Sequence, residues 1–79
     1  MKIKPIASNQ TELELNDGTV VLFSYQTPVA AFVAQHGWVK TSRKWSRTTS
    51  KHITQWLSGV KATEMPQEFF DTLTAGAAI

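Results

Sequence analysis

The stretch Thr11-Glu-Leu-Glu-Leu-Asn-Asp-Gly-Thr-Val-Val-Leu-Phe23 decides the fold of this chain. Leucine and glutamate alternate over residues 12–15, which is the period of a strand with one buried face. Residues 16–18, Asn-Asp-Gly, are the type that a tight hairpin turn requires, because such turns need backbone with positive φ. The returning strand, residues 19–25, has an apolar centre on both faces, as in a central strand covered from two sides. These residues therefore predict an antiparallel sheet.

Short strands are also expected on either side of this hairpin. Pro28 ends the returning strand or begins the next one, because proline cannot donate to a strand ladder. Residues 35–37, Gln-His-Gly, indicate a second hairpin turn. Pro5 is tolerable only if its strand lies at an edge of the sheet. The further strands are expected at residues 3–6, 29–34 and 38–41.

The hydrophobic period changes after residue 46. Apolar side chains then recur at the spacing of an amphipathic helix, at Ile53, Trp56, Leu57 and Val60. Ser46 or Thr48 can cap its start, and Gly59 is placed to end it. A second helix is expected from Pro66 to near Gly76, burying Phe69, Phe70 and Leu73.

Together these patterns predict one α+β domain spanning residues 1–79. The expected architecture is a mostly antiparallel sheet of four to five strands, flat or curled toward a small barrel, with both C-terminal helices packed on one face. A chain of 79 residues is short, so a single core is expected.

Composition indicates the compartment and excludes some site types. The chain has no cysteine, so disulfides and thiolate metal sites are excluded, and a reducing compartment is favoured. No apolar run approaches the length that crosses a bilayer, and residues 1–5 lack the apolar stretch of a signal peptide. We therefore expect a protein of the cytoplasm with no membrane partner.

The charge is distributed unevenly. No Asp or Glu lies between Asp17 and Glu64, while six lysines and arginines do. Residues 40–52 hold five of those cations and six hydroxyl side chains around Trp45. A field of one sign favours encounter with polyanions.

This segment is the candidate binding site, and nucleic acid is its expected partner. Helical spacing directs Arg47 and Lys51 away from the apolar stripe, so both project outward together. Trp45 is expected to be partly exposed and to stack on bases, with Trp38 and Tyr25 as further stacking platforms. The alternative is an ordinary solvated helix face with Trp45 in the core. The expected phosphate-binding residues are Lys40, Arg43, Lys44, Arg47 and Lys51.

No pattern in the sequence indicates catalysis, a metal or a cofactor. His36 is expected in a turn and His52 at the border of the helix stripe, and two histidines without a spaced partner make no metal site. There is no Gly-x-Ser-x-Gly elbow and no glycine-rich phosphate loop. We therefore expect a protein that is not an enzyme.

Three motifs carry a resemblance to a known family: Ser24-Tyr-Gln-Thr-Pro-Val-Ala30, Lys44-Trp-Ser-Arg-Thr-Thr-Ser-Lys-His-Ile53 followed by Trp56-Leu57, and Pro66-Gln-Glu-Phe-Phe70. The chain resembles a family of small uncharacterised domains of tailed phages and related bacterial sequences, over about residues 20–73. The resemblance implies a phage origin and the host cytoplasm, and it implies no activity and no catalytic residues.

Two functions follow as expectations. The first is a phage-encoded nucleic-acid-binding protein, DNA favoured, whose contacts with phosphates are largely independent of sequence. The alternative is a host-takeover or anti-defence protein that binds and inhibits an acidic host protein through the same basic and aromatic residues. Pairing into a homodimer through exposed strand edges is a further expectation.

Overall fold

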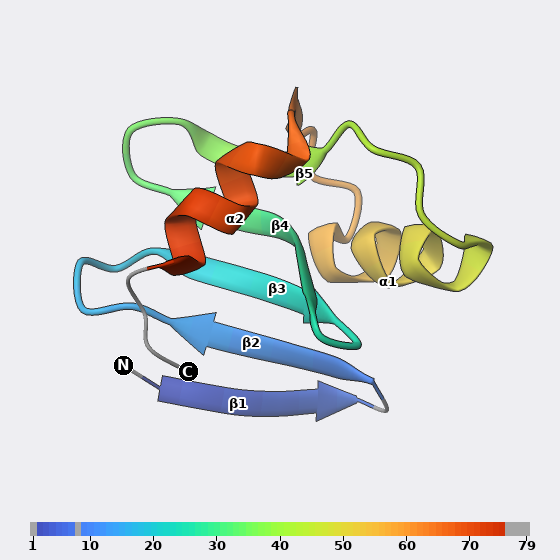
Figure 1. Cartoon of the computed structure of the whole chain (residues 1–79), viewed down its shortest axis with the longest axis horizontal. Coiled ribbons are helices and arrows are strands. Elements are labelled where there is room, and N and C mark those ends of the chain that lie inside the picture. The colour runs from blue at the N-terminus through green and yellow to red at the C-terminus, as the bar shows by residue number, and fades with distance from the viewer. Residues whose placement is uncertain (1, 8, 76–79) are drawn as a thin grey trace.

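The computed structural model describes residues 2–7 and 9–75. It is an open sheet of six strands, in the order β1-β2-β3-β4-β5-β6, with two helices (Figure 1). The elements, in chain order, are β1 Lys2–Ala7, β2 Gln10–Glu14, β3 Val20–Ser24, β4 Thr27–Val33, β5 Gly37–Thr41, α1 Arg47–Leu57, β6 Thr63–Met65 and α2 Gln67–Ala75. The α+β class and the mostly antiparallel sheet are confirmed. The count of four to five strands and the barrel-like alternative are wrong.

The first hairpin forms as its residues predict, with one refinement. Leu15 and Thr19 close the loop through Leu15 N–H and Thr19 C=O at 2.8 Å, and Gly18 N–H donates to Leu15 C=O at 3.1 Å. Only Gly18 has positive φ, at 89°, so the loop is a turn followed by one left-handed residue. The second turn is also confirmed, and Gly37 is its left-handed residue, with φ 74°.

The antiparallel part of the sheet runs from β1 to β5, and β6 adds to β5 in parallel. A parallel neighbour needs a crossover connection, and α1 is that connection. Sequence analysis missed β6 because its three residues have no hydrophobic period. Pro28 lies within β4, beside an irregularity in the pairing of β3 with β4, where a ladder bond is interrupted anyway.

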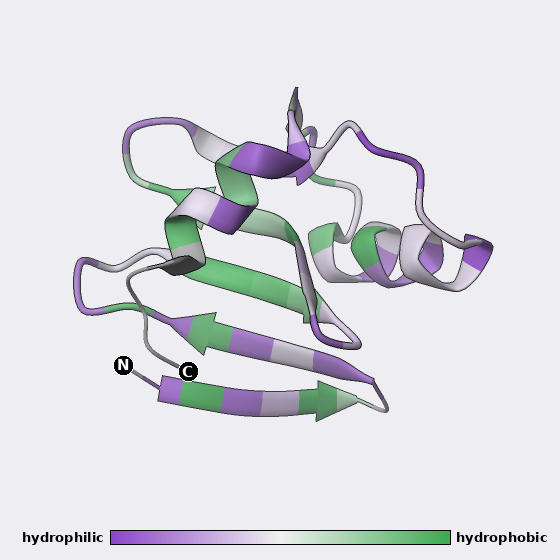
Figure 2. Ribbon diagram, in the orientation of Figure 1, coloured by the Kyte–Doolittle hydropathy of each residue, from purple (hydrophilic) through white to green (hydrophobic). Residues whose placement is uncertain are grey.

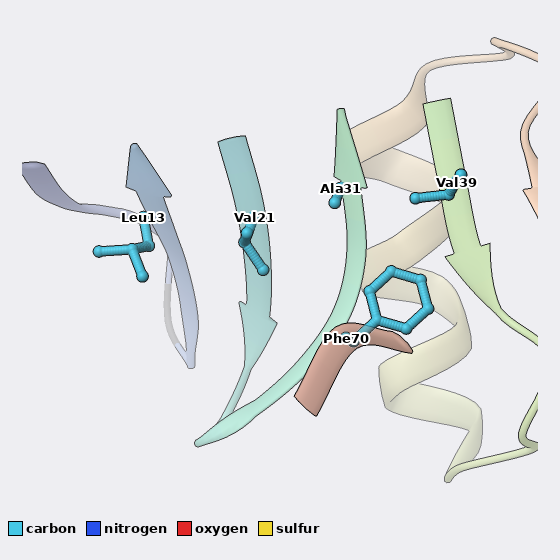
Figure 3. Packing of buried hydrophobic residues seen from close by; sticks show 5 residues of the cluster. All are labelled: Leu13, Val21, Ala31, Val39 and Phe70. Atoms are coloured by element: carbon cyan, nitrogen blue, oxygen red, sulfur yellow. The ribbon is translucent and has the colours of Figure 1, made fainter. Parts of the chain in front are cut away.

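The two helices pack on opposite faces of the sheet, so the prediction that both pack on one face is wrong. Phe70 of α2 packs with a row of side chains from four neighbouring strands: Leu13, Val21, Ala31 and Val39 (Figure 3). On the other face, Trp45, Ile53 and Trp56 pack against Leu22, Val29 and Ala30 of β3 and β4. The central strands are therefore the most hydrophobic part of the sheet (Figure 2).

Both helices begin close to where their capping residues predict. Ser46 is the N-cap of α1, and its hydroxyl accepts a hydrogen bond from Thr49 N–H at 3.2 Å. Ser58 is the left-handed residue that ends α1, with φ 50°, and Gly59 follows at 84°. The predicted stop of the second helix at Gly76 lies outside the described residues. None of the described helices is long and apolar enough to cross a bilayer.

Candidate nucleic-acid interface

Two polar networks hold the segment that carries the basic residues. On one side, Ser24 Oγ of β3 lies 3.0 Å from Thr49 Oγ1 and 2.8 Å from His52 Nδ1 of α1. All three residues are buried, and Ser24 is only 2% exposed. The network therefore anchors the buried side of α1 to β3, and no carboxylate of the described residues bonds to His52.

The second network is centred on Gln67 at the start of α2. Its Oε1 accepts hydrogen bonds from Thr41 Oγ1 at 2.8 Å and from Trp45 Nε1 at 3.1 Å. Its Nε2 donates to the Pro28 carbonyl at 2.8 Å and to Asp71 Oδ1 at 3.2 Å. Gln67 thus ties the loop between β5 and α1 to β4 and to α2. Sequence analysis missed this residue, because an isolated glutamine at a helix start carries no signal.

Four of the candidate cations gather around the start of α1. Arg43 and Lys44 lie on the loop that enters the helix, and Arg47 and Lys51 lie one turn apart on its outward side; all four are exposed. Within the described part of the chain, none has a carboxylate oxygen within 4.0 Å. Figure 2 shows this loop and the beginning of α1 as predominantly hydrophilic. We call Arg43, Lys44, Arg47 and Lys51 the basic surface.

Lys40 is less exposed than the residues of the basic surface and has an acidic neighbour in the sheet. Its side chain lies on the same sheet face as α1, half-buried, and its register partner on β6 is Glu64. No Asp or Glu lies near Lys40 in the sequence, but the parallel pairing of β5 with β6 makes Glu64 its neighbour in the sheet.

Trp45 is half-buried and belongs partly to the core. It packs against the cluster of Leu22, Val29 and Ala30, and its only polar atom donates to Gln67. The guanidinium carbon of Arg43 lies 4.6 Å from the centre of the Trp45 ring, a cation–π contact. A base could stack on this ring only by displacing Arg43 or by stacking on the guanidinium itself.

Trp38 lies apart from the basic surface. It is on the α1 side of β5, 36% exposed, with its ring 4.8 Å from Phe32 and 5.5 Å from Trp56 between centroids. Trp56 in turn donates its indole N–H to Glu12 Oε2 at 2.7 Å. Trp38 therefore belongs to an aromatic cluster with an acid beside it.

Tyr25 lies beside α1 and is more exposed than Trp38 or Trp45. It is 51% exposed at the tip of the hairpin between β3 and β4, and its ring centroid is 6.0 Å from that of His52 on α1. Its φ is 59°, unusual for an aromatic residue, and its N–H donates to Asn9 C=O at 2.7 Å. Strained backbone of this kind concentrates at functional sites. The sequence predicts Tyr25 only as a further stacking platform in addition to Trp45.

The described residues contain no group of three or more metal-ligating side chains. The arrangement provides four exposed cations and, near α1, the exposed ring of Tyr25, which suits binding of an anionic polymer.

The chain belongs to a family of unknown function, DUF8033, whose model matches residues 1–72. The expected likeness to small uncharacterised domains is therefore confirmed, and it reaches the N-terminus rather than starting near residue 20. No curated protein matches the chain. No solved structure matches it either.

Proposed function

We propose that this member of the DUF8033 family binds nucleic acid through the basic surface, without catalysing a reaction. The observation that carries the proposal is the set of four exposed cations around the start of α1, none paired with a carboxylate in the described part of the chain. Ordinary protein surfaces intersperse charges of both signs. Unpaired cations on a rigid helix and its entry loop release counterions from phosphates when they bind.

The exposed ring of Tyr25 favours single-stranded over duplex nucleic acid as the ligand. A base of a single strand can unstack and lie on an exposed ring, which contributes about 1 to 3 kcal/mol per base. A duplex offers its bases only in its grooves. DNA is favoured, and the phosphate contacts carry no sequence preference.

Fluorescence anisotropy with labelled single-stranded and duplex oligonucleotides, titrated across salt, tests the proposal. Four phosphate contacts predict a slope of log K against log salt of about −3 for single strands and −3.5 for duplex. The double variant Arg47→Ala/Lys51→Ala should reduce the steepness of that slope by about 1.5, since two contacts are lost.

The double variant Lys2→Ala/Lys4→Ala is the matched control. It removes the same charge from β1, at the edge of the sheet, and should leave the slope nearly unchanged. If both double variants lower affinity equally, only net charge matters and the basic surface is not the site.

The alternative of an inhibitory protein that binds an acidic host protein has one observation in its favour. Arg43 stacked on Trp45 is a preordered arginine, and arginine and tryptophan are frequent hot-spot residues. A pull-down from nuclease-treated bacterial lysate distinguishes the two functions. A host protein retained by the wild type and lost with Arg43→Ala would favour the alternative.

A phage origin and action in the host cytoplasm are proposals that rest on the resemblance of the motifs alone. Sequencing of the genes that flank this one tests the origin. Flanking genes for phage structural or replication proteins are expected, and a chromosomal setting without any of them would contradict it.

A further inference from the structure

A shallow pocket of about 340 Å³ lies on the α1 side of the sheet, away from the basic surface. Its walls come from four neighbouring strands, β2 to β5, and from α1. The lining residues are Glu12, Val20, Phe32, Trp38 and Trp56. Three of the five are aromatic, one is a carboxylate, and none is basic.

The three rings form a concave surface. Phe32 and Trp38 are register partners on β4 and β5, and their rings are inclined by 58°. Trp56 stands over the sheet from α1, with its ring inclined by 72° to that of Trp38. Inclined rings that line one volume can present their electron-rich faces to it from different sides, whereas their edges are electron-poor.

Glu12 supplies the only charge of the lining. One of its oxygens, Oε2, accepts the indole N–H of Trp56 at 2.7 Å, which fixes the carboxylate beside the ring. That bond also uses the one polar atom of Trp56, so the remaining oxygen of Glu12 is the main polar feature that a ligand would meet. Lys4 is the register partner of Glu12 on β1, yet no ion pair within 4.0 Å joins these two described residues.

The C-terminal end of α1 adds to the negative potential that Glu12 gives the pocket. Trp56 lies in its last turn, which contains no basic residue, and the C-terminal end of a helix is the negative end of its dipole. Lys61 follows the helix and is exposed, but it does not line the pocket.

These features match one ligand class. A quaternary ammonium group is positive and weakly hydrated, and it has no N–H to satisfy, so aromatic faces and one carboxylate suffice for it. A primary ammonium is strongly hydrated and carries three donors, for which the lining offers too few acceptors. We propose that this pocket binds a trimethylammonium group. The proposal is independent of nucleic-acid binding, because no residue of the basic surface lines the pocket.

The test is a titration of the ¹⁵N-labelled protein with choline, followed by NMR. The expected result is saturable shifts of the indole N–H signals of Trp38 and Trp56, with a Kd on the order of 1 to 10 mM. The Trp45 indole N–H, which donates to Gln67, is the internal reference.

The neutral carbon isostere 3,3-dimethylbutan-1-ol is the matched ligand control. It has the shape of choline without the charge, and it should bind about tenfold more weakly if cation–π contacts with two or three rings carry the affinity. Equal binding of the two ligands, or no shift with choline at about ten times the expected Kd, overturns the proposal.

Two variants measure how much Trp38 and Glu12 contribute to choline binding. Trp38→Ala should weaken choline binding about tenfold. Glu12→Gln keeps an oxygen that can accept from Trp56 and removes only the charge, so it should weaken choline binding several-fold and leave the isostere unaffected. Unchanged choline affinity in Glu12→Gln contradicts the role of the carboxylate even if Trp38→Ala fails to fold.

A peptide containing trimethyl-lysine distinguishes the source of the group. Binding of this peptide at least about tenfold tighter than choline would indicate a methylated protein. Equal affinity would indicate a small molecule. If the peptide shifts signals only outside the pocket, the proposal of a trimethyl-lysine source is overturned.

Discussion

At the scale of single residues, Gln67 joins three segments of the chain by hydrogen bonds, and no pattern in the sequence indicates this role. Gln67→Ala removes hydrogen bonds to Thr41, Trp45 and the Pro28 carbonyl. We expect the free energy of unfolding to fall by about 2 to 3 kcal/mol, because each bond contributes about 1 kcal/mol net. Urea denaturation followed by tryptophan fluorescence measures this, with exposed Gln55→Ala as the control. A loss no larger than that of the control would mean that water replaces the bonds.

Asp17 gives the first hairpin a dependence on pH. The backbone N–H of Thr19, which donates to Asp17 Oδ1 at 3.0 Å, lowers the pKa of this carboxyl below its ordinary value of 3.8, and the Thr19 hydroxyl adds to the effect. A lowered folded-state pKa stabilises the protein above pH 3.8, and this contribution is lost as pH falls through the folded-state pKa.

Between neutral and acidic pH, the melting temperature of Asp17→Asn should therefore fall less than that of the wild type. Differential scanning calorimetry across pH measures the difference. Because Asp17 is exposed, the effect should be small. Identical pH profiles would contradict it.

At the scale of elements, α1 depends on a buried polar contact with β3. Ser24→Ala removes the partner that Thr49 and His52 share. Thr49 Oγ1 keeps its hydrogen bond from Ser46 Oγ, but the buried His52 Nδ1 is left unsatisfied, at a cost of about 1 to 3 kcal/mol. Hydrogen exchange should show a larger loss of protection in α1 than in α2, because α2 packs on the other face. Ser50→Ala, on the exposed side of α1, is the control. Equal loss in both helices would indicate that the two faces unfold as one unit.

At the scale of the whole molecule, the open sheet leaves β1 as an exposed edge. All six residues of β1 are exposed, and Pro5 in its middle lacks the N–H that an added strand would need. Pro5→Thr should therefore promote pairing between molecules, seen as a larger mass at higher concentration in light scattering after size exclusion. Lys2→Thr, which keeps the proline, is the control. A Pro5→Thr variant whose mass stays that of a monomer at every concentration would show that the proline does not protect this edge.

Local patterns predicted most of the elements. The alternation in residues 12–15, the turn at residues 16–18 and the stripe of Ile53 and Trp56 each depend on neighbours within a few residues, so they can be read without the fold. Ser46 as a cap belongs to the same class. The apolar centre of β3 on both faces predicted that the sheet is covered from two sides. That prediction was correct, and it is inconsistent with the prediction that both helices pack on one face.

The sequence by itself determined the α+β class, the positions of the helices and the outward direction of Arg47 and Lys51, because backbone period and capping act over short distances. Tertiary structure alone decided that α1 and α2 take opposite faces and that β6 joins β5, since these depend on how a crossover packs. It also paired Glu64 with Lys40 across β5 and β6 and placed the ring of Tyr25 near His52 of α1. Which charges lie next to each other depends on contacts between residues far apart in the chain. Counting charges along the sequence therefore could not show that Lys40 has an acidic neighbour while the four residues of the basic surface have no carboxylate partner among the described residues.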